Sequence, residues 1–192
     1  MKKKIGDDYN RQITGNLGEV TIKDLRTKEE IRVDRILRES PLIDGHNDLA
    51  FTIQKYEHSD VSRLHLEDLT LEDPRKSSNW SRTDIKRLRQ GRVGAQFWAS
   101  FVFCNGTTNS TKAALDGIEI IHQFVDKYPD TLYWADSVAS IRAGFRAGKI
   151  ASLIGIENGR AIGNQRNDLE YSLRALRDFY DKGVRYSCSY NL

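Results

Sequence analysis

The 192-residue chain lacks the marks of several common protein classes. It has only two cysteines and four histidines, and none of them falls in a CxxC or a Cys/His zinc-finger spacing. No apolar run reaches the length of about eighteen residues that a transmembrane helix needs, and the basic start of the chain lacks the apolar stretch of a signal peptide. The end of the chain shows no lipid-anchor signal. These absences argue against a zinc finger and against a membrane-spanning helix.

Two catalytic signatures are also missing. No GxSxG motif marks a nucleophilic serine, and the glycines of residues 91–94 and 155–159 fit neither nucleotide-binding fingerprint. The sequence therefore leaves two possibilities, a metal-assisted reaction or no catalysis at all.

The charge is nearly balanced, with a net value of +3 and both signs spread along the chain, which excludes nucleic acid as an expected partner. One basic cluster stands out, and we expect it to be a solvated helix face because no aromatic residues are interleaved with it. Its members are Arg82, Lys86, Arg87, Arg89 and Arg92.

Hydrophobic residues make up 39% of the chain and charged residues 30%, as in a soluble globular protein. Residues 1–28 are polar and without period, which predicts a flexible tail, and residues 29–192 predict a folded domain. Helical and strand patterns alternate in that domain, so the sequence predicts βαβ units around a parallel sheet. The expected strands are residues 42–46, 93–103, 131–134, 150–156 and 184–186, and the expected helices are 29–39, 81–90, 112–127, 137–147 and 168–182. Residues 57–80 are expected to be mostly loop.

The segment LIDGHNDL, residues 42–49, is the most informative in the chain. His46 and Asp48 follow a short apolar strand, and alternate residues of a strand project to one face. An imidazole beside a carboxylate is a donor set that zinc accepts. The alternative is a polar turn in which His46 is merely hydrogen-bonded.

Glu157 follows the apolar run of residues 150–156 and precedes a turn that contains Gly159. Parallel α/β folds place their active sites at the carboxyl ends of strands, where His46, Asp48 and Glu157 are all expected. A buried carboxylate there needs a charged partner or a metal. The alternative is a salt bridge to a neighbour such as Arg160.

Of the other histidines, His122 is expected to pack on a helix, and His58 and His65 match no ligand spacing.

Four stretches together resemble the membrane (renal) dipeptidases, which are zinc peptidases on a (β/α)8 barrel. The stretches are LIDGHNDL, VGAQFWASFVFC, VASIRAGFRAGKIASLIGIENG and the late GVRY. The resemblance runs from about residue 33 to residue 186 and implies a partial TIM barrel with roughly the first half of its strands. It implies that His46 and Asp48 bind the first of two zinc ions and that Glu157 bridges both. A metal-activated water would then hydrolyse a dipeptide.

The departures from the family limit this expectation. The histidines of the second zinc, the acid/base aspartate and a substrate-binding arginine are not found, and Asn191 stands where a substrate-contacting histidine is expected. We therefore expect a truncated chain that is inactive alone and has no catalytic residue beyond its metal ligands. The alternative function is a non-catalytic regulatory fragment that associates, as a homo- or hetero-oligomer, with a full-length relative.

The family resemblance also bears on location and on the cysteines. Relatives are commonly exported and anchored to the membrane through a glycolipid, and three glycosylation sequons, at Asn79, Asn105 and Asn109, agree with export. From their spacing, Cys104 and Cys188 could pair, stay free or bond to other chains. Cys104 matches a family cysteine whose partner is expected beyond this chain.

Overall fold

The computed structural model describes residues 11–14, 21–24, 26–69, 83–103, 109–163 and 168–188. The chain divides into two compact units, Met1–Ser40 and Pro41–Leu192. The boundary at residue 28 expected from the sequence lies within the first of these units.

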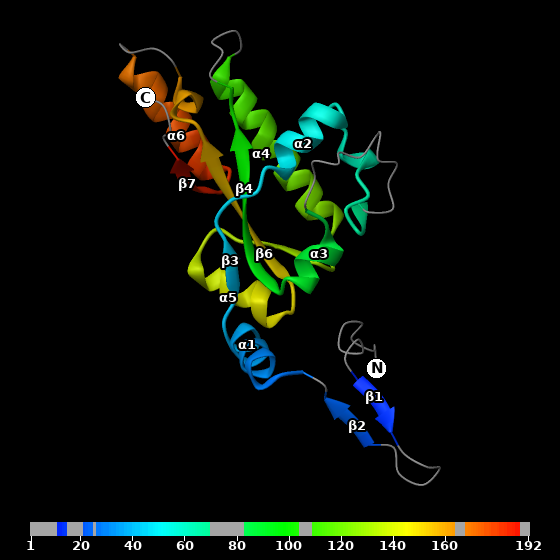
Figure 1. Ribbon diagram of the computed structural model, residues 1–192. Coiled ribbons are helices and arrows are strands. Elements are labelled where there is room, and N and C mark those ends of the chain that lie inside the picture. Colours follow the sequence, from blue (N-terminus) through cyan, green and yellow to red (C-terminus); the bar gives the residue numbers. More distant parts are fainter. Residues whose placement is uncertain are drawn as a thin grey trace. The chain divides into compact units, whose positions relative to one another are not determined.

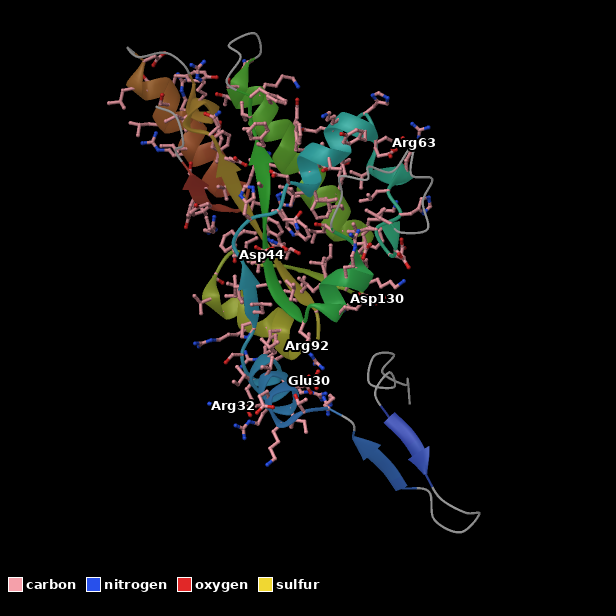
Figure 2. All side chains as sticks on the ribbon, in the orientation of Figure 1. Glu30, Arg32, Asp44, Arg63, Arg92 and Asp130 are labelled. Atoms are coloured by element: carbon pink, nitrogen blue, oxygen red, sulfur yellow. The ribbon has the colours of Figure 1, made fainter. Side chains whose placement is uncertain are left out.

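The first unit contains two short strands and one helix. Strand β1 (Arg11–Thr14) pairs antiparallel with β2 (Thr21–Asp24), within the segment that the sequence suggested was a polar tail. Helix α1 (Lys28–Glu39) begins with a capping box, in which the Thr27 hydroxyl accepts from the Glu30 amide and the Glu30 carboxylate (labelled in Figure 2) accepts from the Thr27 amide. The helix ends at Ser40, whose backbone is extended because Pro41 follows it.

The second unit is built on a parallel five-stranded sheet (Figure 1). The order is β3-β4-β6-β5, and β7 pairs with the same edge of β6 that β5 uses. Strand β5 pairs with the start of β6 and β7 with its end, so the two share that edge at different heights. The bounds of the strands are Leu42–Asp44 for β3, Val93–Phe101 for β4, Leu132–Trp134 for β5, Ile150–Glu157 for β6 and Val184–Cys188 for β7.

The helices and turns of the second unit lie between these strands in the sequence. They are α2 (Leu49–Tyr56), η1 (Val61–Arg63), α3 (Ile85–Gln90), α4 (Ser110–Lys127), α5 (Val138–Arg146), η3 (Gly159–Ile162) and α6 (Leu169–Asp181). None of the helices in the described ranges is both long enough and apolar enough to cross a membrane. The strand–helix alternation confirms the predicted α/β class.

The main core lies on one face of the sheet. Trp98 of β4 is fully buried and packs edge-on against Phe124 of α4, with a centroid distance of 5.0 Å. Ile154 of β6 belongs to the same cluster. On the other face, Ala151 and Leu153 form a smaller cluster against which Ile141 of α5 packs. Because both faces are covered, β6 is apolar along nearly its whole length, as the sequence pattern predicted.

Three local predictions differ from the structure. Helix α2 begins directly after Asp48, in a segment for which no helix was predicted. Strand β3 is two residues shorter than expected and is exposed, because it is the edge strand next to β4. Helix α3 is capped by Asp84, whereas the predicted cap at Ser81 lies outside the described residues.

Candidate metal centre at the carboxyl ends of the strands

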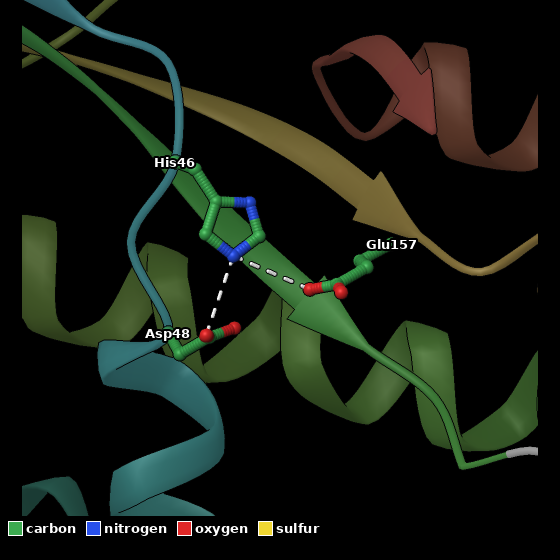
Figure 3. A group of neighbouring side chains, drawn as sticks. All are labelled: His46, Asp48 and Glu157. Carbon is green, nitrogen blue, oxygen red and sulfur yellow. Dashed lines mark hydrogen bonds and ion pairs between the residues drawn. The ribbon is translucent and has the colours of Figure 1, made fainter. Parts of the chain in front are cut away.

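His46, Asp48 and Glu157 meet at one point (Figure 3). His46 lies in the segment that connects β3 to α2, Asp48 is the residue immediately before α2, and Glu157 ends β6. The prediction that a strand would project His46 and Asp48 to one face is therefore wrong in its mechanism. The two side chains converge although neither residue belongs to a strand.

Three donor atoms in this group are close enough to share one ion. His46 Nε2 lies 3.3 Å from Asp48 Oδ2 and 3.3 Å from Glu157 Oε2, and one ligand atom from each residue lies within 4.8 Å of the other two. Donors about 2.1 Å from a zinc ion in tetrahedral geometry are about 3.4 Å apart. One imidazole and two carboxylates at these separations fit a zinc or a similar divalent cation.

The two carboxylates repel each other electrostatically. Partial burial raises the pKa of Glu157, the negative charge of Asp48 raises it further, and His46 acts in the opposite direction. A bound cation would offset both unfavourable effects because it attracts the ionised carboxylates. The electrostatics of the group thus favour occupation by a cation.

A small hollow adjoins the group. Its lining includes His46 and Glu157 together with Phe97, Gly155 and Tyr186. Phe101 pairs in register with Glu157 on the neighbouring strand, so both side chains are on the same face. The ring of Phe101 contacts those of Phe51 and Phe103 at centroid distances of 5.3 and 5.0 Å. An aromatic surface therefore borders the polar group.

Arg160 does not neutralise Glu157. Among the described residues no ion pair joins the two, and the Arg160 amide instead donates to the Asn158 side chain at the start of η3. The salt bridge expected as the alternative for Glu157 is therefore not formed with Arg160, and the ion-pair partner of Glu157 is His46.

The other histidines lie outside the group. His122 has the structural role expected of it, since its Nε2 is 2.9 Å from the Lys182 carbonyl oxygen and its ring stacks on Trp134. The basic cluster also has structural contacts: Arg87 pairs with Asp84, Lys86 with Asp68, and Arg89 donates to the Gly148 carbonyl.

Several predicted sites fall outside the described residues. Asn79, Asn105, Cys104 and the side chain of Cys188 are among them. Asn109 is described and exposed, and it caps α4 by accepting from the Lys112 amide.

Two polar residues beside the group were not predicted. Asn47 lies between the two candidate ligands, and Gln96 lies fully buried in β4 beside it. Gln96 stands within the VGAQFWASFVFC stretch as a polar residue in an apolar strand, and this was the signal that could have marked it.

Parallel strands that bring a histidine and two carboxylates together at their carboxyl ends are typical of a metal-binding protein of the (β/α)-barrel class. The sequence profile of the membrane dipeptidases (peptidase family M19) matches residues 30–190, and the chain belongs to that family.

Known relatives agree with this assignment. The chain is 37% identical over 166 residues to dipeptidase ataJ of Aspergillus terreus, a match that covers 82% of this chain and 37% of the relative. The fold is similar to that of the probable dipeptidase PvdM from Pseudomonas aeruginosa, with a TM-score of 0.57 and 16% identity over 87% of this chain and 39% of that one. It is also similar to a metallo peptidase from Rhodobacter sphaeroides liganded with a phosphinate mimic of the dipeptide L-Ala-D-Ala, with a TM-score of 0.56 and 16% identity over 77% and 44% of the two chains.

These relatives are longer proteins, of which the chain spans between 37% and 44%. The likeness to their structures confirms the partial TIM-barrel fold. Their names are those of dipeptidases and metallopeptidases, and they do not favour the alternative of a regulatory fragment.

Proposed function

We propose that this chain provides the first metal-binding half-site of a zinc dipeptidase, with His46, Asp48 and Glu157 as the ligands. The observation that carries the proposal is the convergence of these three side chains, with 3.3 Å between the histidine nitrogen and each carboxylate. Family membership supports hydrolysis of dipeptides as the reaction. A second zinc, which Glu157 would bridge, is part of the proposal by family resemblance.

The chain's own residues have distinct roles in this scheme. His46 offers Nε2 as a neutral donor, and the two carboxylates balance the charge of a divalent cation. The adjoining hollow, lined by Phe97 and Tyr186, offers an apolar surface next to the ligands. When bound, zinc polarises the peptide carbonyl and makes water a better nucleophile.

Zinc titration calorimetry on the chain tests the proposed ligands. We expect the wild-type chain to bind zinc and His46→Ala to lose at least about 100-fold in affinity, because one of three donors is removed. His65→Ala removes an exposed histidine that does not belong to the group, and should bind zinc as the wild type does. A wild-type chain that binds no zinc, or a His46→Ala chain that binds it equally well, would refute the proposal.

We propose further that the 192-residue chain alone hydrolyses dipeptides weakly or not at all. His58, His65 and His122 are the remaining histidines, and none of them joins the group within the described ranges. Within the part of the chain that the structure describes, no further histidine is therefore placed to bind a second metal at this group. Release of amino acids from Gly-Leu by the zinc-loaded chain, abolished in His46→Ala, would overturn the inactivity while supporting the proposed ligands.

Export and glycosylation belong to the proposal as well. Asn109 is exposed, and its cap of α4 uses the amide oxygen, whereas a glycan is attached to the amide nitrogen. The cap and a glycan are therefore compatible. The mass lost on enzymatic deglycosylation of the secreted protein should be smaller by one glycan in Asn109→Gln than in the wild type; an equal loss in the two proteins would contradict glycosylation at this site.

A further inference from the structure

Asn47 lies between the two proposed ligands of the β3–α2 segment and contacts the body of the fold. Residues 42–46 and Asp48 are exposed, whereas Asn47 is half-buried. Its neighbours His46 and Asp48 belong to no strand or helix, so the pairing within the sheet does not fix their positions. Their placement must come from other contacts.

The polar groups of Asn47 supply such contacts. Its side-chain nitrogen donates to Thr83 Oγ1 at 2.8 Å and, more weakly, to Gln96 Oε1 at 3.4 Å. Its side-chain oxygen accepts from the Leu49 amide at 3.1 Å, and its carbonyl accepts from the Ala99 amide of β4 at 2.8 Å. Both the side chain and the backbone of Asn47 are thereby attached to the fold.

Gln96 holds the segment on the other side of His46. Its side chain is fully buried, and its Nε2 donates to the carbonyl of Asp44 at 3.3 Å and to that of Phe97 at 3.2 Å. The side-chain amide of Gln96 therefore contacts the segment on both sides of His46. Its nitrogen donates to Asp44, and its oxygen accepts from Asn47. A fully buried amide with partners on both sides is costly to misplace, because its donors and acceptors would lose their hydrogen bonds.

We propose that Gln96 is a positioning residue for the metal site, which holds residues 44–47 against β4 so that the His46 and Asp48 donors lie at ion-sharing distance. This inference rests on the proposed function, since it concerns how the chain prepares the site for zinc. The ligand side chains themselves are about half-exposed, so the hydrogen bonds beneath them have to set their separation. Loss of the groups that orient metal ligands typically weakens metal binding about 10- to 100-fold.

Zinc calorimetry on Gln96→Met tests the inference, because methionine keeps the approximate volume and removes both the donor and the acceptor. The matched control is Ser100→Ala, in the same strand, which removes a buried hydroxyl that donates to the Ala114 carbonyl of α4, away from the site. We expect about a 10-fold or larger loss of zinc affinity in Gln96→Met and no loss in Ser100→Ala. The visible spectrum of the cobalt-substituted protein should change only in Gln96→Met, because it reports ligand geometry rather than stability.

Wild-type affinity and a wild-type cobalt spectrum in folded Gln96→Met would overturn the inference. So would an equal loss of affinity in Ser100→Ala, because that loss would reflect weakened folding alone. If Gln96→Met does not fold, Asn47→Ala removes the other partner of the same hydrogen bond at a more exposed position. A loss of zinc affinity with a changed cobalt spectrum in Asn47→Ala would then support the inference, and wild-type affinity with a wild-type spectrum would overturn it.

Hydrogen exchange without metal separates this inference from the proposed function. The Ala99 amide, which donates to the Asn47 carbonyl, should exchange faster in Gln96→Met than in Ser100→Ala. Equal exchange in the two variants would overturn the positioning role even if zinc binds. Conversely, a wild-type chain that binds no zinc refutes the proposed ligands, and the exchange rates still decide whether Gln96 holds the segment.

Discussion

At the scale of single residues, Tyr128 joins the end of α4 to the segment before α3. Its hydroxyl donates to the Leu64 carbonyl at 2.8 Å and accepts from the Leu66 amide at 2.9 Å. Burial raises the pKa of this phenol, and the nearby Glu67 carboxylate adds to the rise. Tyr128 therefore stabilises the fold as a neutral hydrogen-bond donor.

The stability that Tyr128 contributes should depend on pH in a definite direction. Its pKa is higher in the folded state than the unfolded value of about 10, so the contribution is complete below about pH 10 and is lost as the pH rises through the folded pKa. Tyr128→Phe should cost about 1–3 kcal/mol at pH 8 and should flatten the decline toward pH 11. Urea unfolding at both pH values measures this, with Tyr180→Phe, an exposed tyrosine, as the control. Parallel declines in the wild type and Tyr128→Phe would contradict it.

The candidate ligands could be found from sequence, whereas their supports could not. His46, Asp48 and Glu157 were identifiable because polar residues that end apolar strands are conspicuous in a parallel α/β pattern. The contact between Asn47 and Gln96 joins residues that are 49 positions apart, and no local pattern encodes which amide meets which. The 3.3 Å separation between His46 and Glu157 likewise joins two segments that are distant in the sequence and could not be predicted.

At the scale of secondary-structure elements, the long periodic segments were predictable, and of the short elements strand β5 was predicted whereas helix α2 was not. Helices α4 and α6 and strands β4 and β6 all lie within two residues of their expected bounds. Helix α2 was missed because its local signals are weak: Asp48 makes no side-chain cap bond there, and the helix is only eight residues long. Burial of Leu49, Ala50 and Ile53 in the core stabilises it instead, and that contribution is tertiary.

Helix α3 offers a prediction at this scale. Its cap, Asp84, is fully buried and accepts from the Arg87 amide, the Arg87 guanidinium and the Leu69 amide at 2.7, 2.8 and 3.2 Å. Asp84→Ala should lower the free energy of unfolding by about 3 kcal/mol, because these donors lose their acceptor. Ser137→Ala, which removes the exposed cap of α5, should cost only about 1 kcal/mol. Urea denaturation of both variants measures these free energies of unfolding. Equal losses in Asp84→Ala and Ser137→Ala would contradict the conclusion that burial makes the Asp84 cap the stronger one.

At the scale of the whole molecule, the second unit exposes apolar surface at its edges. The exposed side chains of α6, which are Leu169, Leu173, Leu176 and Tyr180, follow helical spacing along one face. The edge strand β3 exposes Leu42 and Ile43. Apolar faces and open strand edges of this kind promote association between molecules.

We therefore expect the isolated chain to self-associate as its concentration rises. Replacing Leu173 and Leu176 by lysine should shift its sedimentation toward the monomer, because both leucines are about 40% exposed and contribute apolar surface to the stripe. Replacing Arg174 and Arg177, on the same helix, by lysine is the control for altered composition. Sedimentation velocity that shows a monomer at all concentrations, or no shift in the leucine variant, would contradict this expectation.

The most direct test of the account is the position of zinc in the protein itself. Crystals grown with zinc and measured across the zinc absorption edge should give an anomalous peak bonded to His46 Nε2 and to carboxylate oxygens of Asp48 and Glu157. A peak at other residues, with these three side chains unligated, would contradict the account, as would crystals of the zinc-saturated chain with no peak at this site.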